Sequence, residues 1–419
     1  MNKDKKPVAI VLGGIYPHGR TLDKLKERGY YTVLIDYFDN PPAAVHADLH
    51  INKSAMDYEA VLAIAQEMDA KLVMSPCLDQ QIVVAVRVAE TLGLPHPFDS
   101  ETARNVTNKK YMKTMMQENG IPTARYYQVK EDSDLTALAL DYPLIVKPVD
   151  SCGAAGVTRV DSPEGLPAAI KMATSWSWSG EAIVEEFKSG MEISAYTYVR
   201  DKKATLVTTQ NRISFMSDQV IKCYGAVSPA EISESVRSHV EEIATKIAQV
   251  FELDTTPLFL QAIIGEDESV SVIEFSPRLG GGTCFRLMEA NADFDMLDAS
   301  IDSYLNTVNM QEPSKEKDCY LIYQVQALEC IYDHTEGLDS LKEEGVISDY
   351  FFQKTKGMHI TTEKASSARV AALLVRGKDK GDCLSKLQQA MQVIKVIDEN
   401  GKDVTDRSLV LDAKDISLQ

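Results

Sequence analysis

The sequence predicts an α/β and α+β multidomain protein that begins with a doubly wound parallel sheet. Three observations lead to this fold class. The chain has 419 residues, more than one ordinary core holds. Strand-like apolar runs alternate with amphipathic helical segments over residues 1–105, which is typical of a parallel sheet. Two further apolar runs, 257–264 and 269–275, flank a short polar segment, as the strands of a β-hairpin do.

Composition excludes several classes of function. Lys and Arg number 44 against 62 Asp and Glu, a net charge of −18 with the acids scattered along the chain. Nucleic-acid binding depends on clustered cations, so we expect no nucleic-acid partner. No apolar run approaches a membrane span, and the seven cysteines show neither C-x-x-C nor zinc-ligand spacing. We therefore expect a cytoplasmic protein with reduced thiols and no membrane partner.

The first 105 residues supply the alternation. The predicted strands are, in order, "PVAIVLGG", "YYTVLIDY" and "KLVMSP". The predicted helices that alternate with them are "TLDKLKERG", "DYEAVLAIAQEMDA" and "QQIVVAVRVAETLG". The segment "GIYPHGRT" matches a phosphate-binding P-loop except at the lysine, where Arg20 stands, and Pro17 removes a backbone N–H. We interpret it as a glycine turn at the carboxyl edge of the sheet.

A second region, 106–310, opens with the helix "TNKKYMKTMMQENGIP". Lys109, Lys110 and Lys113 crowd its first turns, where the helix dipole disfavours cations unless an anion is present. Solvated surface lysines are the alternative. In "YPLIVKPVDSCGAAGV", Lys147 interrupts an apolar strand and needs a counter-charge. The loop that follows contains Ser151, Gly153 and Gly156, and its backbone N–H groups could lie over phosphates.

Two later segments carry acids on strands. In "AIVEEFKSGMEISAYTYV", Glu192 starts a strand after Gly190, where it can accept bonds from sugar hydroxyls or face water. In "VIEFSPRLGGG", Glu274 lies in a strand that ends at Ser276 and Arg278, before Gly280 to Gly282.

If Gly265 pairs with Val270 in the hairpin, Gln261 lies directly opposite Glu274, with Ser276 next on the same face. These oxygen ligands suit Mg²⁺ held jointly with phosphates. Arg278 suits a phosphate or carboxylate, and the glycines let a ligand approach the backbone.

Taken in this order, these motifs resemble the ATP-grasp superfamily over residues 1–310, and within it the carboxylate–amine ligases that join amino acids. The carbamoyl phosphate synthase and biotin carboxylase group is a more distant likeness. The resemblance implies that Lys109 and Lys147 contact the ATP phosphates under the loop 151–156. It implies that Glu185 and Phe187 offer backbone groups to the adenine, and that Glu192 binds the ribose. Glu274 and Gln261 would hold Mg²⁺, and Arg278 would stabilise the acyl phosphate or tetrahedral intermediate.

Two positions depart from the family pattern. Gln261 stands where most members carry glutamate, and Ser276 replaces the asparagine of E-x-N-P-R. The number of ions therefore stays open at one or two, with Mn²⁺ as an alternative to Mg²⁺. We expect an ADP-forming ligase whose partners are a small-molecule carboxylate and an amine, assembled as a monomer or a homodimer. The alternatives are a ligase or kinase for a larger or sugar-acid carboxylate, and a non-catalytic nucleotide-binding protein.

The remaining segments concern the substrates. Residues 208–225, with Arg212, Asp218 and Lys222, read as a substrate loop or as a surface excursion between strands. Residues 311–419 predict a C-terminal α+β domain with the strands "CYLIYQVQAL", "SDYFFQK" and "ARVAALLVRG". Within it, Arg369 and Arg376 are candidates for shaping the substrate site, or are exposed charges at strand ends.

Overall fold

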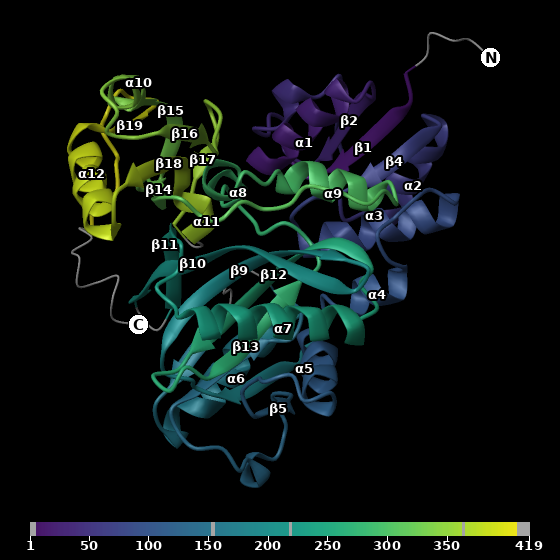
Figure 1. Cartoon of the computed structure of the whole chain (residues 1–419), viewed down its shortest axis with the longest axis vertical. Helices are drawn as coiled ribbons and strands as arrows, with labels where there is room; N and C mark the ends of the chain where they lie inside the picture. The colour runs from purple at the N-terminus through teal and green to yellow at the C-terminus, as the bar shows by residue number, and fades with distance from the viewer. Residues whose placement is uncertain (1–5, 152–155, 218–219, 363–364, 409–419) are drawn as a thin grey trace.

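The computed structural model describes residues 6–151, 156–217, 220–362 and 365–408. It is an α/β and α+β protein built around four sheets (Figure 1), so the predicted fold class is confirmed. The predicted division at residues 105 and 310 stays a prediction. The eight-stranded sheet runs across the second of these positions without a break.

The N-terminal region is a parallel sheet in the order β3-β2-β1-β4. Strand β3 is missing from the sequence prediction, because this edge strand is half exposed and carries no apolar run. The first helix begins at Tyr16, five residues before the predicted start at Thr21. The elements are β1 (Val8–Leu12), α1 (Tyr16–Glu27), β2 (Tyr31–Asp36), η1 (Ala44–His46), β3 (Leu49–Asn52), α2 (Tyr58–Glu67), β4 (Ala70–Met74), α3 (Asp79–Leu92) and α4 (Ser100–Asn105).

The central region places a small sheet, β5-β8-β6-β7, against one end of the eight-stranded sheet β13-β12-β9-β10-β11-β14-β18-β16. Its helices are α5 (Lys109–Glu118), η2 (Leu135–Ala137), η3 (Pro163–Gly165), α6 (Leu166–Ser175), α7 (Glu234–Val250), α8 (Phe285–Ala292) and α9 (Met296–Tyr304). Its strands are β5 (Tyr126–Val129), β6 (Leu144–Pro148), β7 (Thr158–Val160), β8 (Ala182–Glu186), β9 (Met191–Arg200), β10 (Lys203–Ser217), β11 (Val220–Ser228), β12 (Thr255–Ile264) and β13 (Val270–Ser276).

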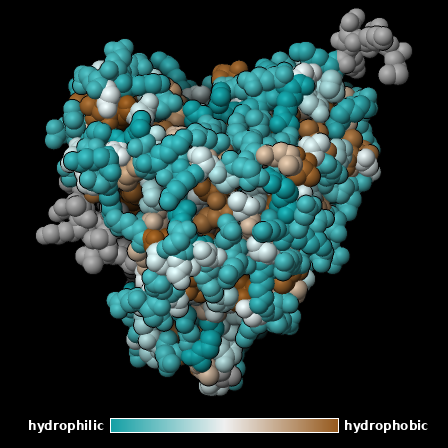
Figure 2. Space-filling view, in the orientation of Figure 1, coloured by the Kyte–Doolittle hydropathy of each residue, from teal (hydrophilic) through white to brown (hydrophobic). Residues whose placement is uncertain are grey.

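The C-terminal region adds strands β14, β18 and β16 to the large sheet and a small sheet, β17-β15-β19. Its elements are β14 (Cys319–Gln326), β15 (Cys330–Glu336), α10 (Leu338–Glu343), β16 (Asp349–Phe352), β17 (His359–Ile360), α11 (Ala365–Ala368), β18 (Arg369–Gly377), α12 (Lys380–Val393) and β19 (Lys395–Asp398). In Figure 1 this region and the N-terminal region stand side by side above the central region. Figure 2 shows a mostly hydrophilic face with a notch between these two upper lobes.

The two faces of the large sheet have different environments. Ile193, Ala195, Leu258 and Leu260 point to the side covered by α7, in an apolar core that continues into the N-terminal region. The opposite side carries polar residues at alternating positions, among them Ser194 and Gln261, which are register partners. Because strand side chains alternate between faces, the polar set lies on one surface of the sheet.

Candidate functional site

Lys109 joins the start of α5 to the end of β6. Asn108 caps α5 by accepting hydrogen bonds from the backbone N–H groups of Lys110 and Tyr111. The Lys109 backbone N–H donates to the Val149 carbonyl at 3.0 Å, which docks the helix start on the end of β6. The Lys109 ammonium donates to the Ser151 carbonyl at 2.7 Å and lies 3.5 Å from Glu274 Oε2. The structure therefore joins Lys109, the loop after β6 and Glu274.

A buried charge triad lies beneath them. Glu185 on β8 contacts Lys147 Nζ at 2.5 Å through Oε1 and Lys113 Nζ at 2.8 Å through Oε2. Lys113, Lys147 and Glu185 are 1%, 4% and 6% exposed. Burial raises the pKa of Glu185, but the two lysines outweigh it and lower that pKa to about 2. Burial lowers the pKa of Lys113 to about 8, although the negative charge of Glu185 acts to raise it.

Lys113 is a site residue that sequence reasoning grouped with Lys109 and Lys110 but to which it gave no role of its own. Its spacing of four residues from Lys109 places both on one face of α5, whereas Lys110 points outward with 43% of its side chain exposed and pairs with Glu181. That spacing was the available signal. Lys109, Lys113 and Lys147 together face two carboxylates, Glu185 and Glu274, so this set carries a net charge of about +1.

Glu274 and Gln261 lie directly opposite each other on β13 and β12, as the sequence predicts. The predicted turn is wrong by one residue, because Ile264 and not Gly265 pairs with Val270. A β-bulge between Gln261 and Ala262 compensates and restores the predicted pairing. Burial raises the pKa of Glu274, but the charges of Lys109 and Lys147 hold it below its usual value. The side chain of Glu274 remains 35% exposed and thus open to a ligand.

Glu192 is joined to this pair from β9. Its Oε1 accepts a hydrogen bond from Gln261 Nε2 at 3.2 Å and lies 2.9 Å from Arg212 Nε. The Glu192 carboxylate therefore already has two partners within the protein, Gln261 and Arg212. Its binding to the ribose stays a prediction. Arg212, on β10, is the member of the predicted substrate loop that reaches the site. Residues 218–219 and the side chain of Lys222 lie outside the part of the chain that the structure describes.

Asp79, the first residue of α3, is a residue that sequence reasoning missed. Its carboxylate accepts hydrogen bonds from Arg278 Nε and Nη2, both at 2.7 Å, and from the Ser276 hydroxyl at 2.6 Å. Burial raises the pKa of Asp79, and Arg278 more than compensates and lowers it. A remaining Arg278 N–H donates to the Leu279 carbonyl. Asp79 therefore fixes the predicted catalytic arginine from the N-terminal region, 199 residues away in the sequence.

The glycines serve different purposes. A Cβ at Gly280 would lie 2.7 Å from the Tyr196 ring, so this glycine makes room for Tyr196 instead of the expected ligand. Cβ atoms at Gly281 and Gly282 would have no neighbour within 4 Å. Gly156 has a φ of +71°, in the left-handed region that favours glycine. Ser151 and Gly156 are the first and last residues of the predicted phosphate loop, whose Gly153 lies outside the described residues.

Glu185 and Phe187, which are predicted to contact adenine, also make contacts within the protein. Glu185 pairs in register with Tyr126 on one side and Ile145 on the other. The Phe187 N–H donates to the Pro143 carbonyl at 3.1 Å. The Phe187 ring lies under the Arg159 guanidinium, 4.4 Å from its centre. A contact to adenine through the backbone at the end of β8 stays a prediction.

The donor set fits a hard cation shared with phosphates. Within the described ranges, no three acidic, histidine or cysteine side chains gather closely enough to hold an ion alone. Glu274 and Gln261 offer a carboxylate and an amide oxygen on one face, and Mg²⁺ commonly takes its remaining ligands from phosphates and water. Ser276 adds a hydroxyl that already donates to Asp79, so its part in a metal site stays a prediction.

Comparison with known proteins shows what this chain is similar to. Residues 140–286 match the model of the family described as ATP-grasp domain. The formate-dependent phosphoribosylglycinamide formyltransferase of Synechococcus sp. (strain WH7803) is 30% identical over 207 residues, covering 48% of this chain and 53% of that protein. The chain spans about half the length of the first curated relatives it matches.

Solved structures share the fold over nearly the whole chain. The L-amino acid ligase from Bacillus licheniformis has a TM-score of 0.76 at 18% identity, covering 95% of this chain and 100% of that one. The biotin carboxylase domain dimer of the Hydrogenobacter thermophilus 2-oxoglutarate carboxylase, in complex with MgADP, ADP and bicarbonate, has a TM-score of 0.77 at 14% identity. This match covers 96% of this chain and 92% of that one. None of the described helices is both long and apolar enough to cross a membrane.

Proposed function

Since this chain carries an ATP-grasp domain, we propose that it is an ADP-forming ligase that activates a carboxylate as an acyl phosphate and joins it to an amine. The observation that carries the proposal is the charge set around Glu274. Lys109, Lys113 and Lys147 exceed the carboxylates Glu185 and Glu274 by one charge, and Glu274 is partly exposed beside Gln261. An excess of positive charge beside a hard-cation ligand suits a magnesium-bound polyphosphate.

The reaction follows from positioning and charge. A carboxylate oxygen attacks the γ-phosphorus of ATP, the bond to the bridging oxygen breaks, and ADP leaves. The amine nitrogen then attacks the acyl carbon and loses one proton, and inorganic phosphate leaves with the electron pair of its bond to carbon. Lys109 and Lys147 would orient the phosphates, with Lys147 held in place by Glu185. Mg²⁺, when held by Glu274 and Gln261, would supply positive charge beside the transferred phosphoryl group.

Arg278 is the residue we assign to the developing oxyanion. Asp79 holds the guanidinium from one edge by two parallel hydrogen bonds, which fixes its plane. A fixed donor needs no reorganisation when negative charge develops on the acyl oxygen. No side-chain nucleophile is required by this scheme, since both attacking atoms belong to the substrates.

The deciding measurement separates the nucleotide products. We would incubate the protein with Mg·ATP and a pairwise panel of amino acids and small carboxylates, and quantify ADP and AMP. We expect ADP and phosphate only when an acid and an amine are both present. Loss of ADP formation by about 1,000-fold is expected in Glu274→Ala, because the charge held there is worth several kcal/mol in the transition state.

The matched control is Glu268→Ala, an exposed glutamate in the turn between β12 and β13, which should keep full activity. AMP and pyrophosphate would contradict the acyl phosphate scheme. ADP formed with an acid alone, and an accumulating acyl phosphate, would indicate a carboxylate kinase instead.

The cell compartment and the assembly belong to the same proposal. The six described cysteines are free thiols, which suits the reducing cytoplasm. A homodimer is proposed by analogy with the biotin carboxylase domain dimer, and sedimentation of the purified chain would test it.

A further inference from the structure

Two cysteines of the C-terminal region lie against each other where α12 packs on the large sheet (Figure 1). Cys319 is the first residue of β14, and Cys383 lies in the first turn of α12. The Cys383 sulfur lies 3.5 Å from the Cys319 carbonyl oxygen, and its thiol donates a hydrogen bond to the Cys319 sulfur. The two residues are 64 positions apart in the sequence, so the fold brings them together.

A glycine makes room for this contact. Gly377 on β18 pairs in register with Cys319, so a side chain at position 377 would point to the same face of the sheet as the Cys319 thiol. A Cβ at Gly377 would lie 2.7 Å from the Cys383 sulfur, closer than Cβ atoms normally come to a neighbour. Because cross-strand partners have Cβ atoms about 5 Å apart, the Cys319 side chain lies beside the space that the Cys383 sulfur fills. Register and glycine therefore place the two sulfurs next to each other.

The two thiols differ in exposure and in pKa. Cys319 is partly exposed, whereas Cys383 is completely buried in the C-terminal core. The hydrogen bond from Cys383 holds the pKa of Cys319 below its usual value, against the effect of burial. The Lys380 ammonium acts in the same direction, and the carboxylates of Asp379 and Glu231 act in the opposite one. The shared hydrogen bond, together with burial, raises the pKa of Cys383. Cys319 is therefore the thiolate of the pair, and Cys383 keeps its proton.

Other cysteines of the chain have the opposite shift. Burial raises the pKa of the Cys77, Cys284 and Cys330 thiols. A raised pKa lowers the thiolate fraction at neutral pH, and the thiolate is the form that reacts. Cys319 combines a lowered pKa with a second thiol in contact, which is the arrangement of a redox-reactive pair.

We propose that Cys319 and Cys383 are a modification site, at which a hydroperoxide converts the two thiols into a disulfide without rearranging the fold. The Cys319 thiolate attacks one oxygen of hydrogen peroxide, the O–O bond breaks, and the other oxygen leaves as hydroxide, which takes up a proton to become water. The Cys383 sulfur then attacks the sulfenic sulfur of Cys319 and gives its proton to the departing hydroxide, so a second water leaves as the S–S bond forms. The peroxide accepts two electrons in all, and both come from the sulfurs.

The disulfide would join α12 to β14 and close a loop of 64 residues, which restricts the unfolded chain. It would also protect the core, because the sulfenic acid forms on the partly exposed partner and is consumed before it reaches a charged, irreversible state. The inference does not depend on the proposed ligase function. The reaction needs neither ATP nor a substrate, and Glu274 lies on β13, at the far edge of the large sheet.

The experiment measures which thiols remain free in the full chain. The reduced protein would be treated with hydrogen peroxide, unfolded in N-ethylmaleimide, and digested for mass spectrometry. We expect a peptide pair joined through Cys319 and Cys383 as the main product, and we expect dithiothreitol to restore both thiols. The pair should be oxidised about 10-fold faster than Cys330, because Cys319 has the larger thiolate fraction. The unfolding midpoint of the oxidised chain should rise by about 5 °C, given the length of the closed loop and of the chain.

Variants assign the order of attack. In Cys383→Ala, Cys319 should stop at the sulfenic acid, which dimedone labels. In Cys319→Ser, Cys383 should keep its N-ethylmaleimide label through the same treatment. The control is Cys330→Ser in the small sheet, which should form the disulfide at the wild-type rate. Thermal unfolding of the reduced variants shows whether each is folded, and Cys319→Ser, at a partly exposed position, carries the test if Cys383→Ala does not fold.

Three results would overturn the proposal. The first is full N-ethylmaleimide labelling of Cys319 and Cys383 at a peroxide concentration that oxidises Cys330. The second is a disulfide that joins either residue to another cysteine or to a second chain. The third is a lower unfolding midpoint in the oxidised chain. ADP formation enters none of these measurements, so failure of the ligase function and failure of the thiol pair are separate outcomes.

Discussion

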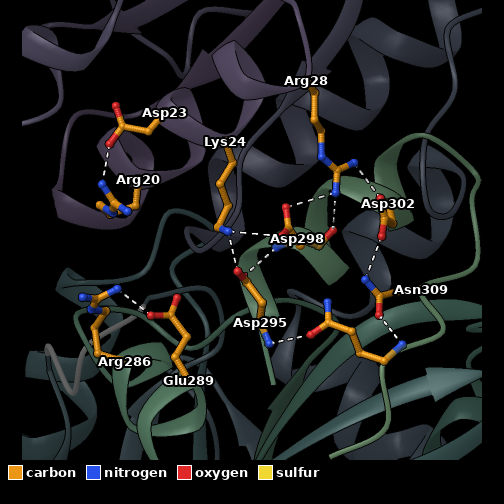
Figure 3. Close-up of polar contacts among 11 residues, drawn as sticks. Arg20, Asp23, Lys24, Arg28, Arg286, Glu289, Asp295, Asp298, Asp302 and Asn309 are labelled. Atoms are coloured by element: carbon orange, nitrogen blue, oxygen red, sulfur yellow. Dashed lines mark hydrogen bonds and ion pairs between the residues drawn. The ribbon is translucent and has the colours of Figure 1, made fainter. Parts of the chain in front are cut away.

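Two charge clusters of similar size are used in different ways by this protein. Around Glu185 and Glu274, three lysines face two acids, and Lys113, Lys147 and Glu185 are almost completely buried. Between α1 and α9, two cations, Lys24 and Arg28, face three acids, Asp295, Asp298 and Asp302 (Figure 3). The side chains of this second cluster are between 15% and 31% exposed.

The second cluster has one acid more than it has cations, and the helix ends compensate this excess. Lys24 lies in the last turn of α1, and Asp295 caps the start of α9 by accepting a hydrogen bond from the Asp298 N–H. Cations at a helix end and acids at a helix start are both favoured by the helix dipole. This cluster needs no ligand, whereas the buried lysines have an excess charge and no helix end to absorb it. The difference teaches that a buried cluster with uncompensated charge marks the functional site, whereas a partly exposed cluster compensated by helix ends joins two regions.

The largest effect is expected for Glu185→Gln. It leaves Lys113 and Lys147 buried beside one another without their counter-charge, and we expect the free energy of unfolding to fall by about 3–5 kcal/mol. Urea denaturation at pH 7 measures it. In the wild type, the stabilisation by Glu185 is complete above its unfolded pKa, near 4.5, and is lost as pH falls toward about 2.

Glu186→Gln is the control for this prediction. Glu186 is the next residue on β8, but its partner Arg125 is 61% exposed, so the loss should stay below about 1 kcal/mol. Equal losses of unfolding free energy in the two variants would show that the buried triad stabilises the protein no more than an exposed ion pair does.

A smaller effect is expected from pH alone. Lys113 should lose its proton near pH 8, which lowers the net charge of the site from about +1 to 0, and we expect the KM for ATP to rise about 10-fold by pH 9.5. Stability should move the other way. Between pH 8 and 10.5 the unfolded chain binds the Lys113 proton more tightly, so this group makes the free energy of unfolding rise with pH.

Initial rates of ADP formation between pH 7 and 9.5 measure this change. Lys113→Met should raise the KM for ATP at pH 7 and remove its dependence on pH over this range. The cluster between α1 and α9 should contribute nothing here, because Asp295 and Asp298 raise the pKa of Lys24 above its usual value, against the effect of burial. A KM that stays constant to pH 9.5 in the wild type would contradict a functional role for Lys113.

The sequence allowed the fold class and the local motifs to be predicted, because strand periodicity and glycine turns are local properties. The pairing of Gln261 with Glu274 was also predicted, but through two errors that cancel. The turn begins one residue earlier than expected, and the bulge between Gln261 and Ala262 adds the residue back. A bulge depends on the packing of the whole sheet and leaves no local pattern at this site.

Contacts between distant segments could not be predicted. Asp79 stands in the sequence just before the predicted helix that begins at Gln80, and nothing nearby indicates that it holds Arg278, 199 residues later. Arg369 and Gln326 are distant in sequence, and only the register of β14 and β18 places them side by side. Lys113 differs from these cases, since its spacing from Lys109 was readable in the sequence, but the phosphate role was assigned to Lys109 alone.

The smallest effect is expected for Lys24→Gln, which removes a cation from the cluster between α1 and α9. The loss in the free energy of unfolding should be about 1 kcal/mol or less, because the acids of α9 keep Arg28 and the solvent as partners. A double-mutant cycle with Asp298→Asn should give a coupling energy of a few tenths of a kcal/mol. The rate of ADP formation should be unchanged in both variants. A large loss of activity with normal stability would mean that the contact between α1 and α9 sets the geometry of the site, and the distinction between a functional and a joining cluster would then fail.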